Sequence, residues 1–151
     1  MNLTTEPEIV NQPKAHYVFL EKVGPFSNTA FQAWQDMHRL EPAISKHNRI
    51  DGAMALYKIG PQIYRAGFLL AAAPQQLPPD VQYVEFGGGK YSRFVLTGSY
   101  ANLPEASGQV WSIVADKQIP LRDDFAIERY MNDPKTTSED RLATESLVPT
   151  A

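Results

Sequence analysis

One acidic residue, Glu128, lies in a pattern that suits ligand chemistry. It belongs to the extended segment 125–131, FAIERYM. Because side chains of a strand alternate between its two faces, Ala126, Glu128 and Tyr130 share one face. A carboxylate beside an aromatic hydroxyl can attract a cation or act as a general base. The same pattern also fits a solvent-facing strand glutamate paired with an Arg or Lys, so the residues alone leave both interpretations open.

Other motifs with chemical meaning are incomplete. The GGGK of residues 87–90 lacks the Ser or Thr that follows the lysine of a phosphate-binding loop, because Tyr91 stands there. The histidines His16, His38 and His47 contain no pair at the i, i+4 spacing of a metal-binding helix. The chain has no cysteine, which excludes thiolate chemistry and disulfides. It also lacks the Gly-x-Ser-x-Gly motif of serine hydrolases. We therefore predict no metal and no cofactor.

The composition is that of a folded domain without a basic surface. Of 151 residues, 43% are hydrophobic and 21% charged, and the formal net charge is −3. Nucleic-acid binders depend on Lys and Arg that face phosphates, so we predict no direct nucleic-acid contact. The apolar run 66–73 is far shorter than the roughly 20 residues of a membrane helix, and the N-terminus does not resemble a secretory signal. We expect a cytoplasmic protein without membrane contact.

Eight strands and two helices are expected from local signals. β-branched and aromatic residues between Gly and Pro predict strands over 8–11, 16–23, 53–59, 63–71, 81–86, 91–97, 125–131 and 142–148. Helical spacing predicts a first helix that begins at Ser27 or Asn28 and ends near Pro42. A second helix should follow a cap at Asn102, with Glu105 completing a capping box.

The chain repeats itself with an offset of about 74 residues. Tyr17 corresponds to Tyr91, and the GPF of residues 24–26 corresponds to the GSY of 98–100. Each copy reads strand, strand, helix, strand, strand. The predicted fold class is therefore α+β, with duplicated units related by a pseudo-two-fold axis, an antiparallel sheet and two main helices.

The copies cover residues 6–73 and 81–149, and the proline-rich segment 74–80 is the predicted linker. A copy of about 70 residues with a single helix cannot cover both ends of its sheet. We therefore expect both copies to pack into one domain spanning 1–151. A groove between two such halves is a natural place for a small molecule.

The repeat makes Glu128 unusual. Its counterpart in the first copy is Ala55, and a tyrosine follows two residues later in both copies, at Tyr57 and Tyr130. A carboxylate needed by the scaffold would be expected in both copies. The asymmetry therefore indicates a site.

The sequence resembles the GyrI-like effector-binding family, which includes the drug-binding domains of multidrug-responsive transcription regulators and the gyrase-inhibitory proteins. The resemblance covers nearly the whole chain, and its most specific part is the ERYMNDP of residues 128–134. The other matching segments are EPEIV at 6–10, GPF at 24–26, GGKY at 88–91, GSY at 98–100 and TE at 144–145.

The resemblance implies a ligand pocket between the halves, with a buried glutamate and aromatic walls. By similarity that glutamate is Glu128, with Tyr130 on the same face and Tyr57 at the repeat-related position. Tyr64, Trp34 and Trp111 are further candidates for the walls. Aromatic residues at these spacings also serve as ordinary core, and this alternative stays open for the last three.

Three functions are compatible with this pattern. The first is a stand-alone binding protein for hydrophobic, aromatic or cationic small molecules. The alternative is a hydrolase of cyclopropane-bearing electrophiles, an activity that the resemblance implies for some members, with Glu128 as the catalytic general base. Ranked below both is a protein partner, such as an inhibitor of gyrase or a companion of a separate regulator. We rank binding above catalysis and expect any DNA-binding part to be on another chain.

Overall fold

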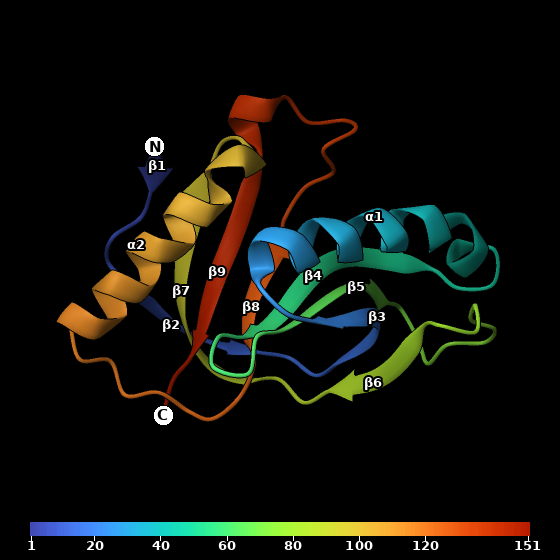
Figure 1. Cartoon of the computed structure of the whole chain (residues 1–151), viewed down its shortest axis with the longest axis horizontal. Helices are drawn as coiled ribbons and strands as arrows, with labels where there is room; N and C mark the ends of the chain where they lie inside the picture. Colours follow the sequence, from blue (N-terminus) through green and yellow to red (C-terminus); the bar gives the residue numbers. More distant parts are fainter. The chain divides into compact units, whose positions relative to one another are not determined.

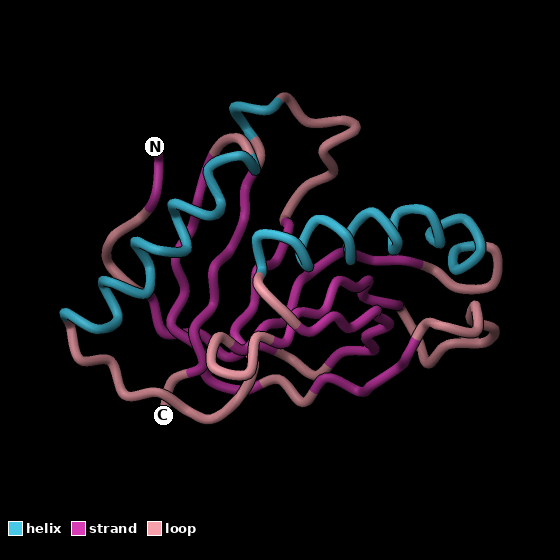
Figure 2. Tube along the Cα trace, viewed as in Figure 1, coloured by secondary structure: helices cyan, strands magenta, loops and turns pink.

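The computed structural model describes residues 1–151 and consists of two compact units. Unit 1 comprises Met1–Gln12 and Gly89–Ala151, and unit 2 comprises Pro13–Gly88. Each unit contains antiparallel strands and one long helix (Figure 1, Figure 2). The predicted α+β class, with antiparallel strands and two main helices, is confirmed.

Unit 2 has four strands in the order β4-β5-β3-β6. Its elements are β3 (Ala15–Val23), α1 (Phe26–Ser45), β4 (Ile50–Lys58), β5 (Ile63–Leu70) and β6 (Gln82–Phe86). Helix α1 lies against β3 and β5 and buries Ala33, Met37 and Ile44 (Figure 1). These residues recur at helical spacing, so one stripe of the helix forms part of the core of unit 2.

Unit 1 repeats this arrangement with β7, β9 and β8 as consecutive neighbours. Its elements are β1 (Asn2–Leu3), β2 (Glu8–Gln12), β7 (Gly89–Thr97), the short 3-10 helix η1 (Tyr100–Asn102), α2 (Leu103–Asp116), β8 (Ala126–Tyr130), the 3-10 helix η2 (Glu139–Arg141) and β9 (Ala143–Pro149). Both β1 and β2 pair with β7. Phe94, Val110, Val114 and Val148 form a buried cluster between α2 and the strands.

The compact units differ from the sequence repeats by one strand each. By sequence β2 begins the first copy, yet it pairs with β7, and β6 begins the second copy, yet it pairs with β3. The other strands keep the same order, because β4-β5-β3 in unit 2 corresponds to β8-β9-β7 in unit 1. Which edge a strand joins depends on tertiary hydrogen bonding that a local pattern does not encode. Residues 74–80 contain no helix or strand.

All eight predicted strands are present, and the boundaries of α1 are the main difference. The helix begins at Phe26, directly after Pro25, and it continues past Pro42 to Ser45. A proline removes one N–H donor, but the carbonyl of Pro42 still accepts from the backbone N–H of Lys46 at 3.1 Å. Ile44 is fully buried, so packing of the last turn outweighs the missing bond.

The predicted cap of the second helix was also misplaced. The side chain of Asn102 forms no capping hydrogen bond, because η1 precedes α2 and gives Asn102 a helical backbone. The capping oxygen belongs instead to Ser99, whose Oγ accepts from the backbone N–H of Ala101 at 3.1 Å. This earlier cap places Tyr100 in the turn that leads into α2.

Candidate functional site

Strand β8 carries the predicted carboxylate and tyrosine side by side. Glu128 lies opposite Ser146 of β9, and Tyr130 lies opposite Thr144, so all four side chains share one face. The hydroxyl of Tyr130 donates a hydrogen bond to Oε1 of Glu128 at 3.4 Å. The structure therefore brings these two predicted site residues together.

Glu128 has no opposite charge beside it. None of the ion pairs of the chain includes this residue. Burial raises the pKa of Glu128 from its ordinary value of 4.5 to about 7, while the hydrogen bond from Tyr130 acts to lower it. The carboxyl group is therefore close to half protonated at neutral pH. The Arg or Lys partner that the alternative interpretation allowed is not present, and the role of Glu128 as a site residue stays a prediction.

A buried carboxylate of unit 1, Glu145, shows the contrasting solution. Glu145 on β9 is 6% exposed and forms an ion pair with the guanidinium of Arg93 on β7. Arg93 also pairs with Glu8 of β2 at 3.2 Å. Burying a charge is costly unless it is paired, and the chain neutralises Glu145 but not Glu128. An unpaired, desolvated carboxyl of this kind marks a candidate functional group.

Tyr100 extends the cluster beyond Tyr130. The two rings meet edge to face with centroids 5.4 Å apart. The Tyr100 hydroxyl is buried without a hydrogen-bond partner, and so is the hydroxyl of Thr144, the register partner of Tyr130. Burial, with a smaller effect of Asp133, raises the pKa of Tyr100, which keeps its proton. The sequence interpretation did not include Tyr100 among the site residues, although the GSY motif contained it.

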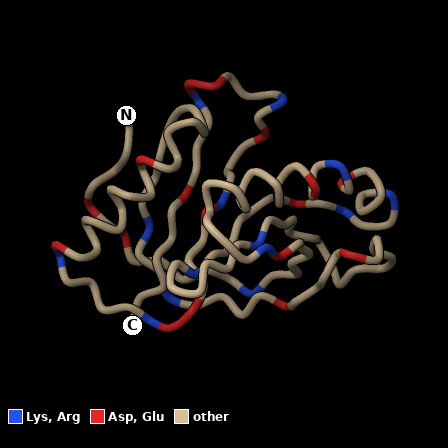
Figure 3. Tube along the Cα trace, in the orientation of Figure 1, with Lys and Arg blue, Asp and Glu red and all other residues tan.

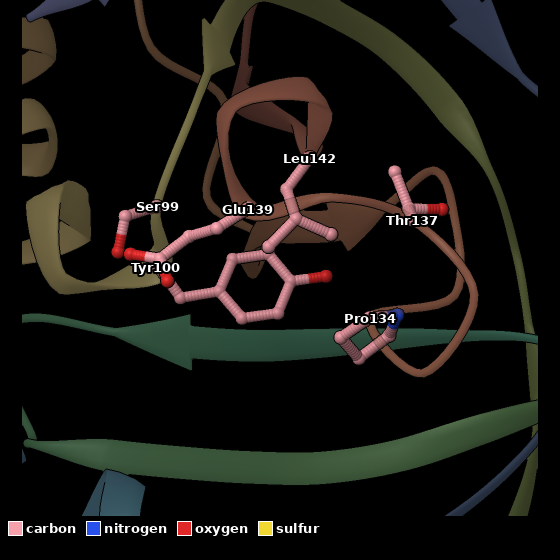
Figure 4. Close-up of a pocket in the computed structure, with 6 residues that line it drawn as sticks. All are labelled: Ser99, Tyr100, Pro134, Thr137, Glu139 and Leu142. Atoms are coloured by element: carbon pink, nitrogen blue, oxygen red, sulfur yellow. The ribbon is translucent and has the colours of Figure 1, made fainter.

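An open cavity of about 290 Å³ adjoins Tyr100 within unit 1 (Figure 4). It is lined by Ser99, Tyr100, Pro134, Thr137, Glu139 and Leu142. Figure 4 shows the ring of Tyr100 among the other five side chains. Glu128 and Tyr130 are not among the residues that line this cavity. Tyr100, which lines it, contacts Tyr130, and Tyr130 is hydrogen-bonded to Glu128.

The loop after β8 forms one wall of this cavity, and Asn132 holds it. The side-chain amide of Asn132 donates to the carbonyl of Arg141 at 3.1 Å and accepts from the backbone N–H of Ala143 at 3.1 Å. This double contact closes the loop against the start of β9. Four residues of the ERYMNDP motif therefore have a role in this part of the structure. Glu128 and Tyr130 supply polar groups, Asn132 fixes the loop and Pro134 lines the cavity.

Three of the predicted aromatic residues gather in unit 2. Trp34 Nε1 of α1 donates to the hydroxyl of Tyr64 at 2.8 Å. Tyr57 and Tyr64 are register partners on β4 and β5, and both are almost fully buried. Phe26 contacts the two tyrosines, with centroid distances of 5.8 Å and 5.7 Å. Phe26 was not predicted as a member of this cluster.

Trp111 packs in the core of unit 1. It is on α2 and packs against the buried cluster of Phe94, Val110, Val114 and Val148. These contacts are those of a core residue. A role for Trp111 in a ligand wall stays a prediction.

Three further features bear on other classes of function: the distribution of charge, groups of metal-binding side chains and the hydropathy of the helices. Basic and acidic residues are interspersed along the trace, without a long segment of one sign (Figure 3). No group of three or more His, Cys, Asp and Glu side chains is arranged to hold a metal ion. Neither helix combines the length and the apolar character needed to span a bilayer.

The chain belongs to the family of GyrI-like small molecule binding domains, whose model matches residues 5–151. The match covers both units, and it confirms the family that the sequence motifs indicated. A search among curated protein sequences finds no match.

Solved structures with the same fold include one effector domain and one ligand complex. The C-terminal domain of EcmrR has a TM-score of 0.79 and 13% identity, covering 100% of this chain and 99% of that chain. SAV2435 bound to tetraphenylphosphonium has a TM-score of 0.70 and 12% identity, covering 97% and 94%. A hydrolase encoded by lin2189 from Listeria innocua has a TM-score of 0.61 and 11% identity, covering 98% and 93%. At such identities the likeness shows the fold alone.

The unpaired carboxyl group predicts an unusual dependence of stability on pH. Because the pKa of Glu128 is about 7 in the folded chain against 4.5 ordinarily, folding is favoured by the protonated form, and stability is lost as the pH rises through this window. Glu128→Gln should be more stable than the wild type above pH 7, by at most about 3 kcal/mol.

Urea denaturation at several pH values measures this difference. Below the ordinary pKa of a glutamate the difference should lose its pH dependence, because the wild-type carboxyl is then protonated in both states. The exposed Glu105 of α2 provides the control, and Glu105→Gln should follow the wild type. A constant difference between Glu128→Gln and wild type across the whole range would contradict the assignment.

Proposed function

We propose that this chain binds lipophilic organic cations, with Glu128 as the countercharge. The single observation that carries the proposal is a desolvated carboxyl group without an ion-pair partner. A bound cation would supply the missing charge. At an effective dielectric constant near 20, two opposite charges about 4 Å apart attract by roughly 4 kcal/mol before desolvation is subtracted.

Aromatic rings beside the carboxylate favour the same class of ligand. Tyr130 lies next to Glu128 and Tyr100 contacts Tyr130, and a cation held over such a ring gains about 0.5–2 kcal/mol. Ring faces attract cations without requiring one shape, so we expect broad specificity. Tyr57, Tyr64, Trp34 and Trp111 stay proposed as further ligand contacts. The structure of SAV2435 with tetraphenylphosphonium, a lipophilic cation, supports the choice of this ligand class.

Tetraphenylphosphonium should bind the wild type more tightly than Glu128→Gln. We expect a loss of about tenfold to a hundredfold, equivalent to roughly 1.4–2.8 kcal/mol, because the variant keeps the shape of the side chain but not its charge. Isothermal titration calorimetry measures the affinities. Glu105→Gln removes the same charge from an exposed position of unit 1 and should bind like the wild type. Equal affinity of all three proteins would refute the countercharge.

Cation binding should depend on pH through the same carboxyl group. Glu128 has to be ionised to attract the ligand, so affinity should be nearly constant well above pH 7 and should fall below it, approaching tenfold per pH unit. Binding at pH 7 should release a fraction of a proton, which titrations in two buffers of different ionisation enthalpy detect. Glu128→Gln should show neither effect, and a wild type with pH-independent affinity would be inconsistent with the proposal.

Hydrolysis is the second candidate, and the pKa of Glu128 near 7 favours it because a general base works best near the ambient pH. In this reaction the oxygen of a water bonds to a carbon of a strained cyclopropane, and Glu128 takes the water's proton. The ring C–C bond breaks, and its electron pair forms an enolate with a conjugated oxygen, to which the Tyr130 hydroxyl donates its hydrogen bond in place of Glu128. Glu128 then returns the proton to the enolate. The product gains one water in total. A hydrolase among the structures with this fold supports testing this candidate.

The hydrolase candidate predicts that the chain adds one water to a cyclopropane-bearing electrophile faster than buffer does. Mass spectrometry of the incubated electrophile measures the product. Glu128→Gln should reduce the rate to background, whereas Glu105→Gln should not. A wild-type rate equal to that of buffer removes this candidate and leaves the binding proposal unaffected.

A further inference from the structure

Tyr100 carries a hydroxyl that the scaffold does not require. Its repeat counterpart is Phe26, which in unit 2 meets Tyr57 edge to face at 5.8 Å. In unit 1 the ring of Tyr100 meets Tyr130 in the same way at 5.4 Å. Because a phenylalanine makes this contact in one unit, the ring alone is sufficient for the packing. The hydroxyl of Tyr100 is additional.

The position of this hydroxyl is unfavourable in the absence of a ligand. It is buried and has no hydrogen-bond partner in the chain. An unpaired buried hydroxyl loses its bonds to water without compensation, so it lowers the stability of the fold. The group keeps its proton, since burial raises the pKa of Tyr100, and it is therefore available as a donor. The Tyr100 hydroxyl therefore destabilises the fold and forms no hydrogen bond within it, as expected of a group that recognises a ligand.

The surroundings of Tyr100 have room for part of a ligand. The cavity of about 290 Å³ is bounded by the ring of Tyr100 together with Pro134 and Leu142, which are apolar, and with Thr137 and Glu139, which are polar. Figure 4 shows the hydroxyl end of Tyr100 directed toward the side where Thr137 and Pro134 lie. The loop that carries these residues is held in place by Asn132, so this wall exists before a ligand binds.

We propose that the Tyr100 hydroxyl donates a hydrogen bond to a carbonyl oxygen of the ligand, and that the adjoining cavity receives the ligand's uncharged, oxygen-bearing substituent. The inference rests on the proposed function, because Glu128 holds the cationic centre of the same ligand. The ring of Tyr130 lies between the two groups, hydrogen-bonded to Glu128 on one side and in contact with Tyr100 on the other. The ligand class is therefore a lipophilic cation that also carries a carbonyl group.

Two phosphonium probes separate the two interactions. Para-isopropylbenzyl-triphenylphosphonium and para-methoxycarbonylbenzyl-triphenylphosphonium have similar size and the same charge, and only the second carries a carbonyl oxygen. Both are titrated against the wild type, Tyr100→Phe and Glu128→Gln. Tyr100→Phe should weaken the ester probe by about threefold to tenfold, the effect of one lost hydrogen bond, and leave the isopropyl probe unchanged. Glu128→Gln should weaken both probes alike.

The outcomes distinguish the inference from the proposed function. If Tyr100→Phe affects neither probe, or both equally, the carbonyl contact is wrong while cation binding stands. If both probes bind Glu128→Gln as tightly as the wild type, the countercharge is wrong and the inference loses its basis, and the same follows if the wild type binds neither probe. Thermal unfolding of Tyr100→Phe provides an independent check, because a variant less stable than the wild type would show that the hydroxyl has a structural role.

Discussion

The carboxyl group of Glu128 is half-buried and poorly solvated, and no ion-pair partner lies beside it. The contacts of the surrounding part of unit 1 start from this group. Tyr130 donates the hydrogen bond that Glu128 receives, and Tyr100 packs its ring against Tyr130. Asn132 then holds the following loop against the cavity wall. The arrangement lowers the stability of the fold, because a charge in a poorly solvated place is unfavourable unless it is paired.

Two carboxylates of unit 1, Glu145 and Glu128, differ in whether an opposite charge is beside them. Glu145 is held by Arg93, which also reaches Glu8, so that three strands are joined by charge pairs. Glu128 has no such partner, although an arginine, Arg129, follows it in the chain. Alternation along the strand directs Arg129 to the other face, where it lies opposite Glu145. Strand geometry therefore keeps the nearest cation in the sequence away from the site.

The duplication of the chain provides an internal comparison for every residue of the site. Glu128 and its partner Ser146 replace Ala55 and Ala66 of unit 2, and Tyr100 replaces Phe26. The ring pair of Phe26 and Tyr57 in unit 2 has its counterpart in Tyr100 and Tyr130 of unit 1, whereas the carboxyl group of Glu128 and the hydroxyls of Ser146 and Tyr100 have none in unit 2. The two copies thus share one framework and differ in polar groups on the corresponding face.

The local sequence pattern determined which residues of β8 share a face, because side-chain alternation depends only on neighbours in the chain. The internal repeat, together with the Gly and Pro residues between its segments, was sufficient to predict the eight strands and the α+β class. The local pattern could not show that Glu128 lacks a partner, since Arg93 and Glu145 become neighbours only when β7 and β9 pair. The exchange of β2 and β6 between the units, the cap at Ser99 and the unpaired hydroxyl of Tyr100 were likewise decided by tertiary structure. Each of these features depends on contacts between strand edges or buried groups that are far apart in the sequence. Such contacts are determined by the packing of the whole chain.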